Sequence, residues 1–383
     1  MRVAHVITRL IIGGAQENTV ATVLGLQEKP DVDVRLYCGP TVGPEGSLES
    51  LVEKVDGLFH RIPNLIRPIR PLSDYLACRQ LKHEFESFRP DIVHTHSGKA
   101  GFIGRLAARR AGVQKIIHSI HGPSFGPFQG CLANGLFRSA EHLAGRMTDH
   151  FINVADAMRD QYLAAGIGQA DDYTCIPSGF NLQPFLEAEN SPAKRESLGL
   201  SPGDFVVGKI ARLFELKGHD DLFDIAPRLA RRIPNIRFLL VGDGVWRGRF
   251  ERLAKQIGCE QNFLFTGLVP PAEIPSLIGV MDALVHLSRR EGLPRALPQA
   301  MAAAKPVVAF NCDGASEVCL DEKTGYLIEP GDLLKLEESL AKLANDAPLR
   351  TALGQAGQAL VKDEFTVEQL VERQYELYRR LLA

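Results

Sequence analysis

Short runs of apolar residues alternate along the chain with longer segments in which apolar residues recur every three to four positions. The short runs predict buried strands, and segments such as Ser73–Ser87, Gly101–Ala111 and Asp221–Arg232 predict helices. Strand after helix in regular alternation is typical of an α/β protein with parallel sheets covered by helices. The predicted strands are Val3–Ile7, Val32–Leu36, Ile92–His94, Ile116–Ile120, His150–Val154, Phe205–Ile210, Arg237–Val241, Phe263–Phe265, Ala283–His286 and Pro306–Ala309.

The alternation occurs twice, which predicts two Rossmann-like, doubly wound domains. We place the first at residues 1–185 and the second at 186–365, because the stretch from Phe185 to Asp204 is polar and rich in turn residues. The segment 366–383 predicts a closing helix with a wide apolar stripe, which we expect to pack back on the first domain. Ligands of open α/β sheets bind beyond the carboxyl ends of the strands, so we expect the two domains to face a cleft.

Composition narrows the class of protein. The chain has 383 residues, 45% of them hydrophobic, and a net charge of −2, which argues against disorder and against a partner such as nucleic acid bound through bulk charge. Seven scattered cysteines form no Cys-x-x-Cys or zinc-like spacing, as expected of a reduced, cytoplasmic protein. No apolar run is long enough to span a membrane, and the N-terminal run reads as a strand rather than a signal peptide.

Several common nucleotide and hydrolase motifs are missing. No Gly-x-Gly-x-x-Gly follows a predicted strand, because Gly242-Asp-Gly244 continues as Val-Trp-Arg and Gly13-Gly14 continues as Ala-Gln-Glu. There is also no P-loop and no Gly-x-Ser-x-Gly elbow. A dinucleotide-dependent dehydrogenase, a P-loop kinase and an α/β-hydrolase therefore all lose their main support.

Two cations follow the strand Phe205–Ile210. Arg212 and Lys217 lie five positions apart, just before a predicted helix that begins near His219. An arginine fork and a lysine ammonium at this place could neutralise one diphosphate without a metal. Taken alone, such a pair is more often part of a solvated helix face.

A carboxylate follows the strand Ala283–His286. Glu291 precedes Pro294, a residue suited to the first turn of a helix, and backbone N–H groups of a helix start would attract anions and hydroxyl oxygens there. A carboxylate at this place can accept hydrogen bonds from sugar hydroxyls. The alternative is that Glu291 only caps the helix.

Taken together, these segments resemble the retaining GT-B glycosyltransferases of family 4. The family's hallmark is a glutamate, seven residues, a second glutamate and Ala-Met-Ala, which corresponds here to Glu291 and to Gln299 followed by Ala-Met-Ala. The resemblance covers nearly the whole chain. The other matching segments are Gly13-Gly14, Asp91–Ser97, Ile120–Gly122, Gly208–Arg212, Lys217–His219, Gly242–Gly244, Phe265–Gly267, Pro306–Ala309 and Thr324–Leu327.

The resemblance implies transfer of a sugar from a nucleotide-diphospho-sugar, with no metal or other cofactor. Arg212 and Lys217 would hold the diphosphate, Glu291 would hold sugar hydroxyls, and His121 would lie near the transferred sugar and the acceptor. Catalytic roles therefore fall to His121, Arg212, Lys217 and Glu291. The other implied donor residues are Gly13, Gly14, Gly242, Gly244, Gly292, Leu293 and Gln299, and the acceptor-side residues are His94 and Ser97.

The sequence departs from the family pattern at Gln299. A glutamine stands where the family has a second glutamate for the ribose hydroxyls, and an amide oxygen is a weaker acceptor than a carboxylate. We expect a loss of about 1 kcal/mol in nucleotide affinity rather than a loss of chemistry. Pro294 also lacks a backbone donor, so Gly292 and Leu293 are the N–H groups expected near the sugar.

Residues 61–115 are unusually basic for this chain. They hold eleven basic and four acidic side chains, an excess of seven positive charges, beside apolar residues such as Ile62, Leu65 and Ile69. A basic surface with exposed apolar residues can bind anionic lipid. The stretch therefore predicts peripheral contact with the inner face of the plasma membrane and a lipid-linked acceptor, with a solvated helix face as the alternative.

The resemblance places the reaction in bacterial surface-polysaccharide or glycoconjugate synthesis, on a glycan or lipid-linked acceptor. Two other functions stay open on the same scaffold. One is a nucleotide-sugar-processing enzyme such as an epimerase, which would turn over the donor without an acceptor. The other is a non-catalytic protein that binds sugar nucleotides, which Gln299 makes conceivable.

Overall fold

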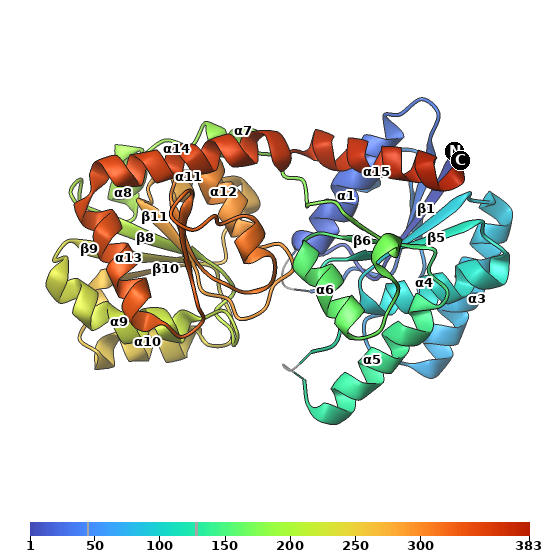
Figure 1. The fold of residues 1–383 in the computed structure, drawn as a ribbon, viewed down its shortest axis with the longest axis horizontal. Coiled ribbons are helices and arrows are strands. Elements are labelled where there is room, and N and C mark those ends of the chain that lie inside the picture. Colours follow the sequence, from blue (N-terminus) through green and yellow to red (C-terminus); the bar gives the residue numbers. More distant parts are fainter. Residues whose placement is uncertain (44–45, 127–128) are drawn as a thin grey trace. The chain divides into compact units, whose positions relative to one another are not determined.

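A computed structural model describes residues 1–43, 46–126 and 129–383 of the chain. These residues fold into two compact units (Figure 1). The first comprises Met1–Phe180 together with Val367–Ala383, and the second comprises Asn181–Thr366. The chain leaves the first unit five residues before the predicted boundary at 185, and its last helix returns to that unit.

The first unit is built on a seven-stranded parallel sheet. The strand order is β3-β2-β1-β4-β5-β6-β7, so the direction in which strands are added reverses between β1 and β4. The strands are β1 Arg2–Ile7, β2 Asp33–Cys38, β3 Phe59–Arg61, β4 Ile92–His96, β5 Lys115–Ile120, β6 His150–Asn153 and β7 Tyr173–Cys175.

Helices cover both faces of this sheet. The helices of the first unit are α1 Gly14–Gln27, α2 Glu49–Val52, α3 Pro71–Phe88, α4 Gly98–Ala111, α5 Cys131–Gly145, α6 Asp156–Ala164 and α15 Val367–Leu382. Because side chains of a strand alternate between faces, Val3 and Ile7 pack with residues of α1 and α15, whereas Ala4 and Val6 pack with residues of α3 and α4. The same alternation decides which polar side chains meet inside the unit.

Helix α15 lies against α1 (Figure 1). It contributes Leu370, Val371, Leu377 and Tyr378 to the core of the first unit. The two helices approach closely at Gly25, where an added Cβ would lie 2.4 Å from Cγ2 of Val371. A glycine is therefore required for this contact.

The second unit is built on a six-stranded parallel sheet in the order β10-β9-β8-β11-β12-β13. The direction in which successive strands are added reverses between β8 and β11. The strands are β8 Phe205–Ile210, β9 Ile236–Val241, β10 Phe263–Gly267, β11 Ala283–His286, β12 Val307–Phe310 and β13 Gly325–Ile328. The helices are α7 Gln183–Leu186, α8 Pro192–Ser197, α9 His219–Arg232, α10 Arg247–Gln256, α11 Ile274–Gly279, α12 Ala296–Ala302, α13 Leu333–Asn345 and α14 Ala347–Glu364.

The predicted α/β class and both parallel sheets are confirmed, and every predicted strand is present. Strands β3, β7 and β13 were not predicted, and all three are edge strands of three or four residues. The polar stretch 185–204, where the sequence places the break between the domains, begins close to the division between the two units and is not devoid of helix. That stretch includes helix α8, whose Arg195 is buried and donates hydrogen bonds to the carbonyls of Ser201, Asp204 and Val280.

Candidate functional site

In the second unit, the predicted donor residues other than Gln299 lie in loops at the carboxyl edge of the sheet. The loops after β8 and β11 flank the point where strand order reverses, which is where open α/β sheets bind ligands. Gly218 ends the loop after β8 with a φ of +62°, and an added Cβ would lie 1.9 Å from the carbonyl oxygen of Leu287 in the loop after β11. This close approach brings the two loops together and needs a glycine.

Lys217 and Glu291 form the centre of this site. Lys217 Nζ lies 2.6 Å from Glu291 Oε1, and both side chains are mostly buried. His286, the last residue of β11, has Nε2 3.2 Å from the same carboxylate oxygen. Burial raises the pKa of Glu291, but His286 and the Lys217 ammonium more than offset burial, so the pKa lies well below its usual range. Glu291 is therefore ionised at neutral pH.

The backbone of Glu291 is held from the loop after β12. Its N–H donates to Asp313 Oδ2 at 2.6 Å, and Asp313 has a left-handed φ of +51°. Helix α12 begins only at Ala296 and its N-cap is Arg295, so the alternative that Glu291 caps this helix is wrong. Pro294 likewise precedes the helix instead of occupying its first turn.

Arg212 stands on the exposed side of the same edge. Its guanidinium carbon lies 5.9 Å from the centre of the Phe214 ring. Its loop is tied to the loop after β9, because Leu213 N–H donates to the carbonyl of Asp243 at 3.0 Å. Gly242 allows this contact, since a Cβ there would lie 2.3 Å from the Ala211 carbonyl oxygen. Gly242 and Gly244 therefore lie beside Arg212, as the motif predicts.

The other predicted donor residues of this unit lie on or near the loop after β11. Gly292 is buried, and its carbonyl accepts a hydrogen bond from Gly314 N–H in the loop after β12. Leu293 is also buried, and Gln299 is partly exposed within α12. Neighbouring loops and a helix thus bring Gly292, Leu293 and Gln299 to the same part of the unit as Glu291.

Three charged groups near Glu291 escaped the sequence analysis. Lys209 on β8 is buried, and burial followed by the charge of Lys217 lowers its pKa to about 7. Arg289 forms a two-pronged ion pair with Asp221 of α9, with N–O distances of 2.6 and 2.7 Å. The sequence offered one indication of Lys209, namely that a lysine interrupts the apolar run of β8. The partners of Arg289 depend on contacts between elements that are distant in sequence.

In the first unit, the predicted residues also lie at or near the carboxyl edge. Gly13 is the N-cap of α1 and Gly14 its first residue, in the segment that follows β1. Ser97 follows β4 with a φ of +63°, which is unusual for a non-glycine residue, and its Oγ lies 3.3 Å from Thr8 Oγ1. His121 follows β5 directly and is partly exposed.

His121 is tied to other histidines. Its Nε2 lies 3.1 Å from Nδ1 of His96, and burial lowers the pKa of His121 to about 4, so the ring is neutral at pH 7. His94 does not fit direct contact with an acceptor, because it is fully buried within β4 and bonded to Tyr378 and Ser119. His118 is buried on the opposite face, with Nδ1 2.9 Å from Thr95 Oγ1.

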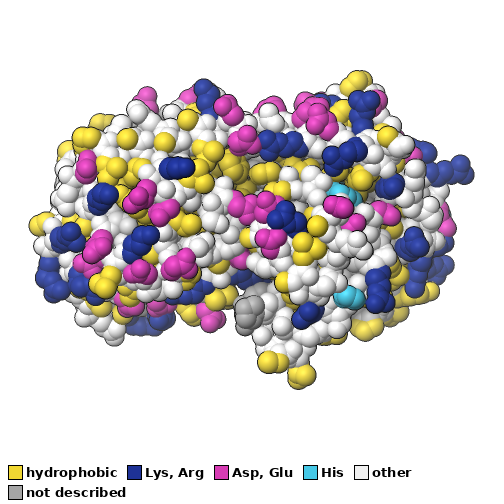
Figure 2. All heavy atoms as spheres, viewed as in Figure 1, with side chains coloured by type: hydrophobic (Ala, Val, Ile, Leu, Met, Phe, Trp, Pro, Cys, Tyr) yellow, Lys and Arg dark blue, Asp and Glu magenta, His cyan; other side chains and the backbone are white. Residues whose placement is uncertain are grey.

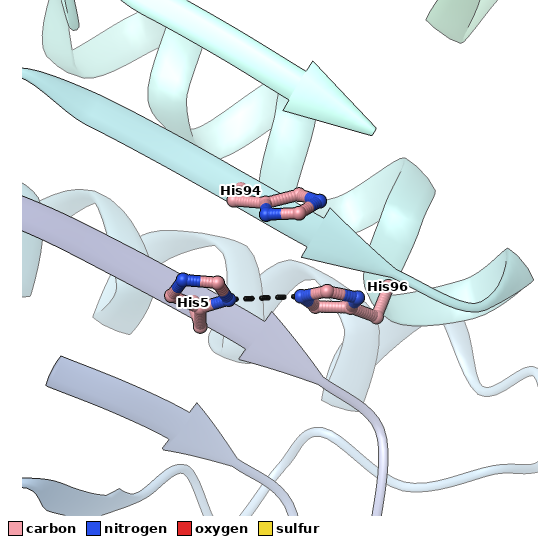
Figure 3. A group of neighbouring side chains, drawn as sticks. All are labelled: His5, His94 and His96. Atoms are coloured by element: carbon pink, nitrogen blue, oxygen red, sulfur yellow. Dashed lines mark hydrogen bonds between the residues drawn. The ribbon is translucent and has the colours of Figure 1, made fainter. Parts of the chain in front are cut away.

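His5, His94 and His96 form a buried group whose nitrogens lie within 4.8 Å of one another (Figure 3). Three neutral imidazoles of this kind could hold a transition metal. In the structure, however, His5 Nδ1 and His96 Nε2 are joined directly at 2.9 Å, a distance at which the two nitrogens share a proton. A metal would have to replace this hydrogen bond.

A cavity of about 590 Å³ opens in the first unit between α3, α4 and α5. Apolar side chains such as Phe102 and Leu106 dominate its lining. The charged residues that line it are Arg67, Arg110, Glu141 and the ion pair of Lys99 with Asp74. Hydrophobic side chains are exposed around it, and Figure 2 shows such side chains at the surface over α5. We call this surface the α3–α5 face; its exposed apolar residues are Ile69, Leu72, Tyr75, Leu76, Leu132, Leu136 and Leu143.

The predicted lipid-binding stretch needs correction in detail. Ile62 and Leu65 are fully buried, and Arg105 is fully buried in an ion pair with Glu141 at 2.8 Å, so none of them can touch a membrane. Arg61 is paired with Glu49 at 2.7 Å. In the part of the chain that the structure describes, no helix has the length and apolar character needed to cross a bilayer.

Family models match both units. The model "Glycosyltransferase Family 4" matches residues 12–184, and the model "Glycosyl transferases group 1" matches residues 190–360. The two matches adjoin and together cover most of the chain. They separate at the same place as the two units of the structure, within about ten residues.

Characterised relatives extend the match. The chain is 26% identical over 382 residues, which is 99% of this chain and 96% of the relative, to the Escherichia coli UDP-Gal:alpha-D-GlcNAc-diphosphoundecaprenol alpha-1,3-galactosyltransferase. It is 29% identical, over 72% of this chain and 73% of the relative, to the GDP-mannose-dependent alpha-(1-6)-phosphatidylinositol monomannoside mannosyltransferase of Mycolicibacterium smegmatis. Both relatives are glycosyltransferases whose names specify lipid-linked substrates.

Solved structures share the fold. HepE of Anabaena in complex with UDP superposes with a TM-score of 0.83 at 22% identity, covering 99% of this chain and 100% of HepE. The complex of HepE with UDP-glucose gives a TM-score of 0.82 at 23% identity, covering 99% of this chain and 100% of HepE. At this identity the likeness concerns the architecture of both units.

Proposed function

The chain is a glycosyltransferase of family 4 with the GT-B fold, and from this premise we propose that it transfers a sugar from a nucleotide-diphospho-sugar with retention of anomeric configuration. The single observation that carries the proposal is the pair Lys217–Glu291 at the point of strand reversal in the second unit. It offers a cation for a diphosphate and an ionised carboxylate for sugar hydroxyls in one place. The UDP and UDP-glucose complexes of HepE support such a donor.

The proposed chemistry is breakage of the bond between the sugar C1 and the diphosphate oxygen. The diphosphate keeps the electron pair, and Lys217 and Arg212 stabilise the negative charge that grows on it. Lys217 is preorganised by Glu291, while Arg212 is exposed and available to a ligand. The acceptor hydroxyl oxygen then bonds to C1 on the face that the diphosphate leaves, and the hydroxyl proton passes to an oxygen of the departing diphosphate. No metal or other cofactor is part of this proposal.

Replacement of Glu291 tests the proposal. Glu291→Gln keeps the size of the side chain but removes its charge, so we expect transfer to fall about 100-fold, within the range for loss of one transition-state contact. Glu251→Gln on α10 removes a carboxylate bonded to Arg247 and serves as the matched control. Transfer at the wild-type rate by Glu291→Gln would contradict the role of this carboxylate.

Turnover without an acceptor separates the remaining functions. Thermal shift with a panel of sugar nucleotides identifies the donor, because a ligand that binds only the folded state stabilises it. That donor is then incubated with the enzyme alone and with a lipid-linked glycan. We expect consumption to depend on the acceptor. An epimerase would convert the donor alone, and a binding protein would leave it unchanged in both reactions.

We propose further that the acceptor is lipid-linked and that the α3–α5 face receives its hydrocarbon portion. Apolar side chains on α3 and α5 flank a cavity that is lined by two arginines, Arg67 and Arg110. Its lining also holds the ion pair between Lys99 and Asp74, and Glu141. The combination suits an amphiphile with a hydrocarbon chain and an anionic head group. The substrates named for the Escherichia coli and Mycolicibacterium relatives, both lipid-linked, support this class of acceptor. The enzyme would then act from the cytoplasm at the inner face of the plasma membrane, in bacterial cell-surface glycan synthesis.

The acceptor proposal is tested by comparing chain lengths. Leu136→Glu places a charge on the α3–α5 face, so we expect KM to rise for an acceptor with a long hydrocarbon chain and to stay constant for a short-chain, water-soluble analogue. Binding to vesicles that contain an anionic phospholipid should weaken in the same variant and in Arg67→Ala. Leu334→Glu, at an exposed leucine of α13 in the second unit, is the matched control. Equal KM changes for both acceptors would contradict the proposal.

A further inference from the structure

A chain of imidazoles runs through the core of the first unit. Because side chains alternate along a strand, His5 on β1 and His94 and His96 on β4 point to the face of the sheet that α15 covers (Figure 3). His121, directly after β5, continues this row. His5, His94 and His96 are fully buried, and His121 is the partly exposed end of the row.

Each member of the row touches the next through ring nitrogens. His121 Nε2 lies 3.1 Å from His96 Nδ1, and His96 Nε2 lies 2.9 Å from His5 Nδ1. His5 Nε2 lies 3.5 Å from the Tyr378 hydroxyl, the longest link. That hydroxyl lies 2.5 Å from His94 Nδ1. A neutral imidazole has one N–H and one bare nitrogen, so the direction of one hydrogen bond fixes the direction of the next.

The far end of the row is fixed by residues of α1 and α15. Thr22 donates its only hydroxyl proton to the carbonyl of Asn18, so its oxygen accepts from the amide nitrogen of Gln374 at 3.3 Å. This orients the amide of Gln374 with its oxygen 3.2 Å from the Tyr378 hydroxyl. Tyr378 therefore gives its single proton to Gln374, and its oxygen only accepts from the histidines.

The proton positions then follow along the row. His5 carries its proton on Nε2, toward Tyr378, and its bare Nδ1 accepts from His96 Nε2. His96 Nδ1 is consequently bare and accepts from His121 Nε2. We infer that Tyr378 is a positioning residue that acts through His5 and His96 to hold His121 in the tautomer protonated on Nε2, with Nδ1 free of a proton.

The environment keeps the row neutral, as this arrangement requires. Burial lowers the pKa of His5 to about 3, and burial together with neighbouring histidines lowers the pKa of His94 and of His96 well below the usual range. The consequence for the reaction rests on the proposed function and concerns Nδ1 of His121. The bare Nδ1 of His121 is the ring nitrogen that can accept a hydrogen bond from an acceptor hydroxyl.

Nitrogen NMR of histidine-labelled protein measures the tautomers without any assay of activity. In the wild type we expect the proton of His121 on Nε2 and the proton of His5 on Nε2. Tyr378→Phe removes only the oxygen at the end of the row, so we expect both residues to become mixtures of tautomers. His96→Leu should release His121 alone. His150→Gln, which breaks a hydrogen bond to Thr174 outside the row, should change neither.

Several outcomes would overturn the inference. They are a proton on Nδ1 of His121 in the wild type, a His121 tautomer unchanged in Tyr378→Phe, or a stoichiometric metal bound to His5, His94 and His96 in the purified protein. Amide spectra show whether Tyr378→Phe keeps the fold, and His96→Leu gives a second test if it does not.

Kinetics distinguish this inference from the proposed function. If His121 contacts the acceptor, Tyr378→Phe should lower kcat in proportion to the rings that present the wrong nitrogen, about twofold for an even mixture of tautomers, with little change in the KM of the donor. The expected tautomers together with unchanged kcat would support the arrangement of the row and would contradict the proposed role of His121 in transfer.

Discussion

The two units place their candidate residues at equivalent edges of their sheets. The residues at the edge of the second unit are charged, whereas those at the edge of the first unit are mainly neutral. The second unit gathers full charges, with Lys217 against Glu291 and Arg289 against Asp221. The first unit gathers imidazoles that burial keeps neutral, from His5 to His121. A shared architecture therefore does not dictate chemistry. Charges suit a diphosphate that gains charge as its bond breaks, whereas neutral rings suit an uncharged hydroxyl that only has to be oriented.

The largest effect should come from removing the cations of the second unit. We expect Arg212→Ala combined with Lys217→Ala to lower transfer at least 1,000-fold, because the departing diphosphate loses both partners. The measurement is kcat/KM with the donor identified by thermal shift. Arg231→Ala combined with Arg232→Ala, at two exposed arginines of α9, is the control that removes the same charge elsewhere. Appreciable transfer by the first double variant, with its melting point intact, would contradict the assignment.

Acid should destabilise the first unit at a higher pH than the second unit. His5 has a pKa of about 3 when folded and about 6.5 when unfolded, so the unfolded state binds the proton first as pH falls. The contribution of neutral His5 to the free energy of unfolding is complete above pH 6.5 and is lost progressively as pH falls toward 3. At pH 5 the loss from His5 alone is about 2 kcal/mol. His94, His96, His118 and His121 act in the same direction, whereas the second unit buries only His219 and His286 among the described histidines.

Hydrogen exchange measures this difference. Amides of β1 and β4 should lose protection between pH 7 and pH 5 before amides of β8 and β11 do. The fluorescence of Trp246, the only tryptophan, reports the second unit separately. His83→Gln changes an exposed histidine and should leave the profile as it is. Simultaneous loss of protection in both sheets would remove the contrast between them.

The smallest effect should come from Gln299. Gln299→Glu restores the carboxylate of the family pattern, so we expect the KM of the donor to fall by up to about fivefold, close to 1 kcal/mol, with kcat unchanged. Gln256→Glu, at the exposed end of α10, controls for the added charge. If the wild type shows no turnover and Gln299→Glu does, the wild type is instead a binding protein.

The sequence predicted the interior of both sheets better than their margins. Central strands such as Phe205–Ile210 are mostly apolar because both faces are covered. The limits of Phe205–Ile210 and Ala283–His286 were predicted to the residue, whereas β4 was predicted two residues too short. The missed strands β3, β7 and β13 lie at edges, where short segments pair on one side only. Strand order, which brings β8 beside β11, depends on contacts that no local pattern encodes.

The same distinction applies to the site. Arg212, Lys217 and Glu291 lie in the loops that follow β8 and β11, where motif and spacing predicted them. Lys209 and His286 lie within strands and looked like core residues until the neighbouring strands were known. His94 was assigned to the acceptor side through the resemblance of the segment Asp91–Ser97, but β4 continues to His96 and buries it. The row from His5 to His121 follows from alternation along strands only after the strands are placed side by side.

The return of α15 to the first unit affects how the protein is made. Leu370, Val371, Leu377 and Tyr378 fill the core beneath β1, yet the ribosome synthesises them after the whole second unit. Residues 1–180 emerge first but cannot bury that face of their sheet until α15 has been synthesised. We therefore expect the second unit to complete its folding earlier during synthesis, against the usual order in which the N-terminal domain folds first.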